Sequence, residues 1–245
     1  MSGYSTFGRL SGIAEDQWGL VTRRQAELAG VSRATVQRLA SQGVLERVRH
    51  GVYRLGGAPV PDFVELRAAW LALAPGVRAW ERRLEQGAVS FRSAALVYGL
   101  GHLPADRHEF TLPIRRQSRQ PDVRLHQRKL RVGEAALVRG LLVTRPARIV
   151  ADLIEEREDS EAVGQVIADA VRGGHDDPGS VAAALVPYAT RFGLADGDGL
   201  ALLGWFLDLV GDPQAPRWMK QARADPPASS TVSVRRPADG DEVDR

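Results

Sequence analysis

Five side chains that can contact DNA bases lie close together in the first quarter of the chain. They comprise two arginines, a glutamine, a serine and a threonine: Ser32, Arg33, Thr35, Gln37 and Arg38. Arginine can bond guanine through two donors, glutamine can do the same to adenine, and serine or threonine can contact bases or phosphates. The same residue types are also common on solvated helix faces, so the element that carries them decides between the two interpretations.

The surrounding sequence predicts a helix-turn-helix. Thr22 and Gln25 have the spacing of a capping box, which begins a helix, and Gly30 suits the left-handed position that ends one. Ser32 then caps a second helix, which Gly43 ends. The apolar residues of this second helix recur at i, i+3 and i+4: Val36, Leu39 and Ala40. With these residues facing inward, the five polar residues face solvent on the helix that can enter a major groove.

A basic β-hairpin is predicted over residues 44–55, with His50 and Gly51 at its tip. A two-residue loop would place Arg47 opposite Arg54, an unfavourable pair unless an anion lies between them. The hairpin is therefore interpreted as the wing of a winged helix-turn-helix. Three of its arginines are predicted to contact phosphate: Arg47, Arg49 and Arg54. Three residues at the start of the first helix are predicted to do the same: Thr22, Arg23 and Arg24.

The text from VTRRQAELAGVSRATVQRL through GVLERVRHGVYRL resembles the N-terminal domain of the AbiEi family, the antitoxin halves of AbiE-type (type IV) toxin–antitoxin pairs. The similarity continues more loosely in VSFRSAALVYGL, HEFTLPI, VRLHQRKL and GLLVTRPARIVADLIE, so it covers roughly residues 15–155. The resemblance implies a winged domain that represses its own operon. It also implies a second domain that counters a nucleotidyltransferase-type toxin.

The amino-acid composition narrows the classes of protein to which this chain can belong. A chain of 245 residues, 44% of them hydrophobic, can bury a core in each of two domains. It has no apolar run long enough to span a membrane, no signal-peptide layout and no cysteine, so we expect a cytoplasmic protein without disulfides or cofactors. Residues 1–58 hold eight arginines against four acidic residues, whereas residues 151–245 hold nine basic against eighteen acidic residues. This asymmetry predicts an anion-binding front half.

The expected fold class is α+β: a winged helix-turn-helix followed by a larger mixed domain with a small central sheet and C-terminal helices. The expected divisions are a loose N-terminus (1–12), the winged domain (13–58), an AbiEi-like effector domain (59–215) and a disordered tail (216–245). Helices are predicted at 13–18, 63–73 (capped by Asp62), 90–97, 160–172, 178–190 and 199–210, and another begins after a Thr144 cap. Strands are predicted at 108–114, 123–126, 134–138 and 140–143.

A second basic segment lies at residues 113–131, with one acidic residue, Asp122. It is either a second phosphate-contacting surface, a docking site for an acidic or RNA-like partner, or a solvated loop. Its seven basic residues are Arg115, Arg116, Arg119, Arg124, Arg128, Lys129 and Arg131.

Catalytic and metal sites find little support. Pro121-Asp122 followed by Gln127-Arg128-Lys129 resembles the layout of metal-dependent nucleases, but the spacing is short and the second carboxylate is missing. A metal cluster of His102, His108 and His126 with Asp106 and Glu109 lacks any known ligand spacing. Asp196-Gly197-Asp198-Gly199 lacks the remaining ligands of a calcium loop and is interpreted as a turn. No catalytic residue, cofactor or metal is predicted.

The favoured hypothesis is a sequence-specific DNA-binding protein, dimeric or cooperative on repeated half-sites of its own promoter, that acts as an AbiEi-like antitoxin. One alternative is an orphan winged-helix regulator without a toxin. Another is a nuclease with a DNA-binding domain.

Overall fold

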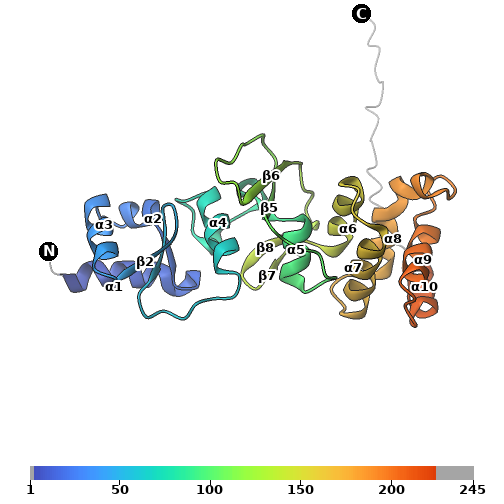
Figure 1. Cartoon of the computed structure of the whole chain (residues 1–245), viewed down its shortest axis with the longest axis horizontal. Coiled ribbons are helices and arrows are strands. Elements are labelled where there is room, and N and C mark those ends of the chain that lie inside the picture. Colours follow the sequence, from blue (N-terminus) through green and yellow to red (C-terminus); the bar gives the residue numbers. More distant parts are fainter. Residues whose placement is uncertain (1–2, 225–245) are drawn as a thin grey trace, which may run out of the picture.

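The computed structural model describes residues 3–224. At the N-terminal end, three helices pack with a small sheet (Figure 1). The elements are α1 (Gly3–Ala14), a 3-10 turn (Glu15–Gln17), β1 (Leu20–Thr22), α2 (Arg23–Leu28), α3 (Arg33–Ser41), β2 (Leu45–Arg49) and β3 (Val52–Leu55). The sheet is antiparallel in the order β1-β3-β2. The expected helix-turn-helix and hairpin are therefore present.

The start of the chain differs from expectation. Residues 1–12 were predicted to be loose and a helix to cover 13–18, whereas α1 begins at Gly3 and ends at Ala14. Leu10, Ile13 and Ala14 recur at i, i+3 and i+4 and are buried against the winged core. Three glycines in α1 weaken its helical signal, so the tertiary contact stabilises it. Strand β1 was not predicted because three residues are too few to show alternation.

The C-terminal segment is built around a five-stranded mixed sheet. From residue 64 to residue 155, its elements are α4 (Val64–Leu73), two 3-10 turns (Ala79–Glu81 and Leu84–Gln86), β4 (Ala88–Val89), α5 (Phe91–Tyr98), β5 (His108–Leu112), β6 (Val123–Gln127), β7 (Ala135–Val138), β8 (Leu141–Thr144) and α6 (Pro146–Glu155). The strand order is β6-β5-β4-β8-β7, with β4/β8 and β5/β6 parallel and β4/β5 and β7/β8 antiparallel. The α+β class is confirmed, although the two-residue strand at the sheet's centre was not predicted.

Two predicted helix caps are wrong by one residue. Helix α4 begins after Phe63, which is in the left-handed region (φ 55°), and Asp62 instead accepts a hydrogen bond from Arg139 at 3.3 Å. Helix α6 begins after Arg145, because Thr144 continues β8 and its side chain is buried. The predicted apolar face of α6 is confirmed, since all four residues are buried: Ile149, Val150, Leu153 and Ile154.

Helices complete the chain at the end opposite the winged elements (Figure 1). They are α7 (Ser160–Arg172), α8 (Pro178–Leu185), a 3-10 helix (Val186–Phe192), α9 (Gly199–Leu209) and α10 (Ala215–Ala224). Helix α10 contradicts the tail predicted from 216, because Trp218 and Ala222 pack into the core one helical turn apart. The rest of that predicted tail, 225–245, lies outside the described residues.

The buried apolar residues form two clusters. One is confined to residues 10–55, and the other extends from α4 to α10. Leu20 of β1 and Val52 of β3 belong to the second cluster, so one face of the winged sheet is buried by the C-terminal segment. The predicted boundary near residue 58 stays a prediction, and whatever its position, the two parts share apolar contacts.

Candidate nucleic-acid interface

Helix α3 presents its polar side to solvent. Ser32 caps the helix by accepting a hydrogen bond from the Thr35 backbone N–H at 3.2 Å, and its hydroxyl lies 2.9 Å from that of Thr35. Val36 is buried and anchors the opposite side, against α2 and β2. Of the five residues of this segment that were predicted to contact DNA, Thr35 is half-buried and the other four are exposed: Ser32, Arg33, Gln37 and Arg38.

The two arginines of α3 are available for an external partner. Arg38 donates only a long hydrogen bond, 3.3 Å, to Gln42. Arg33 forms no ion pair with any residue from 3 to 224. Helix α3 lies at the end of the molecule far from α9 and α10 (Figure 1), so the C-terminal helices do not cover it. Within the described part of the chain, this face is therefore open to an external partner.

The wing differs in register from the prediction. Tyr53 lies opposite Arg47 rather than Val48, because a bulge interrupts the pairing between Arg47 and Arg49. Arg54 consequently faces Glu46, with which it forms an ion pair. The predicted facing pair of arginines is wrong, and with it the argument for an anion between them. The predicted tip is confirmed, with Gly51 in the left-handed region (φ 77°).

Three residues predicted to contact phosphate are held inside the molecule. Thr22 is fully buried, caps α2 and donates from its hydroxyl to the carbonyl of Pro75. The Arg49 side chain is only 9% exposed and pairs with Asp122, and Arg54 is occupied by Glu46. Arg23 and Arg24 are more accessible but contact Glu27 at 3.4 and 3.5 Å. Among the wing arginines, only Arg47 is exposed, 3.0 Å from the ring of His50.

Asp122 fixes the wing to the C-terminal segment, a role that the sequence did not reveal. Burial alone would raise the pKa of Asp122, but the hydrogen bond and charge of Arg49 outweigh burial and lower it. His108 lies 3.8 Å from the same carboxylate, and burial together with Arg49 lowers its pKa. Because Arg49 and Asp122 are far apart in the sequence, no local pattern predicts this contact.

We expect Asp122→Asn to lower the free energy of unfolding by about 1–2 kcal/mol at neutral pH. The loss is below the ~3–5 kcal/mol of fully buried pairs because the Asp122 side chain is 42% exposed. The lowered pKa means that the carboxylate stabilises the fold above its unfolded-state pKa of about 4 and ceases to do so as the pH falls through its folded value. Urea unfolding at pH 7 and pH 3 measures both effects. An equal difference between variant and wild type at the two pH values would contradict the assignment.

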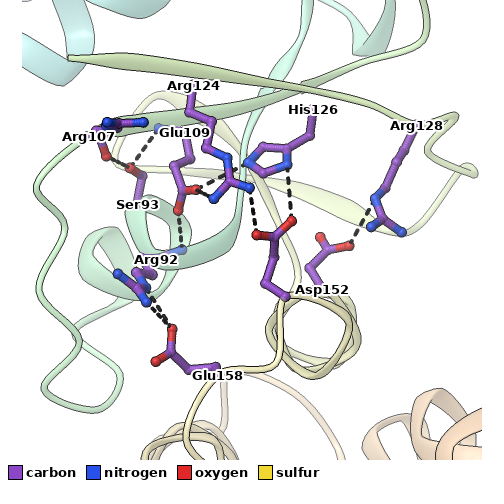
Figure 2. Close-up of polar contacts among 10 residues, drawn as sticks. Arg92, Ser93, Arg107, Glu109, Arg124, His126, Arg128, Asp152 and Glu158 are labelled. Atoms are coloured by element: carbon purple, nitrogen blue, oxygen red, sulfur yellow. Dashed lines mark hydrogen bonds and ion pairs between the residues drawn. The ribbon is translucent and has the colours of Figure 1, made fainter. Parts of the chain in front are cut away.

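The second basic segment does not form one surface. Arg124 lies 3.7 Å from Glu109, and Arg128 lies 3.9 Å from Asp152 (Figure 2). Arg124 also pairs with Glu156 at 2.6 Å, and Arg128 pairs with Glu155. Arg116 donates to the Leu73 carbonyl and holds its loop on α4. The remaining four basic residues of this segment are exposed and form no ion pairs inside the described part of the chain: Arg115, Arg119, Lys129 and Arg131.

Three of the residues considered for a metal, His108, His126 and Glu109, make structural contacts. Glu109 accepts from the N–H of Arg92 at the start of α5, and His126 lies 3.2 Å from Glu109 (Figure 2). The His126 ring also stacks on Phe91. Within residues 3–224, no group of three His, Asp or Glu side chains is arranged to hold a metal ion. Asp122, needed by the nuclease hypothesis, is occupied by Arg49. Asp198 caps α9, as a turn before a helix predicts.

Sequence comparison agrees with this geometry over the N-terminal part of the chain. Residues 9–56 match the model of a protein family described as "Transcriptional regulator, AbiEi antitoxin". The match extends from α1 to the end of the wing and confirms the resemblance for these residues. A search of the curated proteins found no match. None of the helices in the described residues is long and apolar enough to cross a membrane.

Proposed function

We propose that this chain, whose first segment matches the AbiEi transcriptional regulators, binds duplex DNA sequence-specifically through α3. The supporting observation is the exposed, mostly unpaired polar face of α3 at the free end of the molecule. Arg33 and Arg38 would bond guanine edges and Gln37 adenine, while Ser32 and Thr35 would contact bases or nearby phosphates. Arg33, Gln37 and Arg38 are exposed on a helix that fits a major groove, and their side chains have few partners within the described residues.

Phosphate contacts would come from a smaller set than the sequence predicted. Arg47 remains on the wing, and Arg23 and Arg24 can exchange Glu27 for phosphate at low cost, because exposed ion pairs contribute little to stability. Arg115 and Arg119 lie on the loop that, with Arg49 and His50, borders a groove of about 240 Å³ beside the wing tip. We propose that this loop contacts the DNA backbone next to the wing. We exclude Thr22, Arg49 and Arg54 from the residues proposed to contact phosphate.

The biological role we propose is that of an antitoxin that represses its own operon. The winged segment would bind repeated half-sites in its promoter, and the C-terminal segment would counter a nucleotidyltransferase-type toxin. The family match supports the regulatory part and covers only residues 9–56. Because the C-terminal segment lies outside the match, an orphan regulator with the same DNA face is the second candidate. A nucleotidyltransferase gene beside this one would favour the antitoxin.

The test is a footprint on the DNA upstream of the protein's own gene, with binding measured over a range of salt concentrations. We expect protection of repeated half-sites, and a logarithmic salt slope of about −0.9 for each phosphate contacted. Random DNA of equal length should bind at least about 10³-fold more weakly at physiological salt. Equal affinity for upstream and random DNA would refute sequence-specific recognition. No binding to either at low salt would refute DNA binding altogether.

A further inference from the structure

One edge of the five-stranded sheet is formed by β7. This strand is terminal in the sheet, and among residues 3–224 it pairs with β8 alone (Figure 1). The backbone groups of an edge strand that point away from its sheet can pair with another strand. The other edge, β6, carries the exposed residues Arg124 and Gln127. Such polar and charged side chains are a usual protection against edge-to-edge pairing, and β7, with the sequence Ala-Ala-Leu-Val, has none.

The hydrogen-bond pattern identifies which groups of β7 are unused. Arg145 donates from its backbone N–H to the carbonyl of Glu134 at 2.8 Å, so Glu134 belongs to a hydrogen-bonded pair of the β7/β8 ladder. Because such pairs alternate along an antiparallel ladder, Ala136 and Val138 also direct their groups toward β8. Ala135 and Leu137 direct theirs outward, and no other group within residues 3–224 bonds to them.

The outward backbone N–H and C=O groups of β7 can pair with the same groups of β7 in a second copy of the chain. If two β7 strands run antiparallel around a two-fold axis at Ala136, Ala135 of each copy lies opposite Leu137 of the other. Each such pair exchanges two N–H···O bonds, which gives four in total. Glu134 then lies opposite Val138, so no like charges meet. A two-fold axis requires one patch to match itself in this way.

We propose that the edge of β7 is a self-association surface through which two copies of this chain join their sheets. The exposure of Leu137 supports a second copy as the partner, because this side chain is 71% exposed and would pack across the junction. A four-residue strand buries far less than the ~1,200 Å² of a stable interface, so the contact is weak in free protein. If the chain binds repeated half-sites as proposed above, this contact supplies cooperativity between two copies on DNA.

The absence of cysteine from the chain permits a direct test. In the proposed pairing, Ala136 of one copy faces Ala136 of the other in a non-hydrogen-bonded pair, where Cα atoms are about 4.5 Å apart. This separation is within the range that a disulfide bridges, about 4.4–6.8 Å. We expect the single variant Ala136→Cys to form a disulfide-linked dimer under mild oxidation without DNA.

The matched control is Val132→Cys, because Val132 is 99% exposed and lies in the loop before β7. Random collision would oxidise the more exposed thiol faster, so the proposal requires Ala136→Cys to cross-link several-fold faster at equal concentration. Equal or faster cross-linking by Val132→Cys would overturn it. So would an Ala136→Cys chain that stays monomeric while it retains the wild-type circular dichroism spectrum.

A second measurement uses the unmodified chain and a charge substitution. Leu137→Lys places two ammonium groups at the junction, whereas Val132→Lys adds the same charge outside it. Sedimentation equilibrium at high protein concentration should show at least tenfold weaker association for Leu137→Lys and no change for Val132→Lys. Equal association constants would overturn the proposal. Neither experiment contains DNA, so failure of DNA binding and failure of self-association are separate results.

Discussion

Replacing both arginines of α3, in the double variant Arg33→Ala and Arg38→Ala, is expected to abolish the preference for upstream over random DNA. Each bidentate contact to guanine contributes about 1–3 kcal/mol of discrimination. Both side chains are exposed and make no ion pair within the described part of the chain, so their removal should leave the fold intact. Competition binding at fixed salt measures the ratio of the two affinities.

The control for this variant removes the same charge from the opposite end of the molecule. Arg217 and Arg223 are exposed on α10, and their double alanine variant should leave the preference unchanged. A smaller, uniform loss of affinity is expected from Arg47→Ala, because a phosphate contact does not depend on sequence. If the α3 variant lost affinity equally for both DNAs, α3 would be a phosphate-contacting helix rather than a base-reading one.

Trp70→Ala should cause the largest loss of stability that we predict, about 3–5 kcal/mol in the free energy of unfolding. Trp70 is fully buried in α4, and its indole N–H donates to the Gly87 carbonyl at 2.9 Å. The Arg82 guanidinium lies over its ring at 4.5 Å, and the ring of Trp18 lies 6.2 Å away. The substitution leaves a cavity and also removes the donor to Gly87.

Trp80→Ala provides the comparison, since Trp80 is 48% exposed in a 3-10 turn of the same segment. Its loss should be below about 1 kcal/mol, because surface substitutions rarely exceed that value. Urea unfolding followed by circular dichroism distinguishes the two variants without relying on tryptophan fluorescence. Similar midpoints for both would show that the α4 core tolerates the cavity, contrary to the packing described above.

Local signals allowed much of the winged segment to be predicted. The Thr22–Gln25 capping box, the Ser32 cap and the glycine at the wing tip each depend on residues a few positions apart, and the structure contains all three. The remaining errors arise from contacts between distant residues. Arg49 pairs across the two segments, so composition alone made it look like a phosphate contact. Helices α1 and α10 form because their apolar residues are buried by other elements.

The same limit applies to the basic segment at 113–131. Its charge was visible in the sequence, but the acidic partners of Arg124 and Arg128 lie on or just after α6 and meet them only in the fold. Neither periodicity nor spacing could separate these paired residues from the exposed ones. The bulge at the wing likewise shifts the strand register, and no glycine or proline in the sequence indicates its position.

The junction between the two segments includes a pair of glutamines whose amides bond each other, at 2.9 and 3.0 Å. Gln17 also accepts from the N–H of Ala79, and Gln25 donates to the carbonyl of Val77, so both amides are shared with the C-terminal segment. Bending at this junction would break several buried hydrogen bonds together, which disfavours reorientation of the winged segment relative to the C-terminal segment.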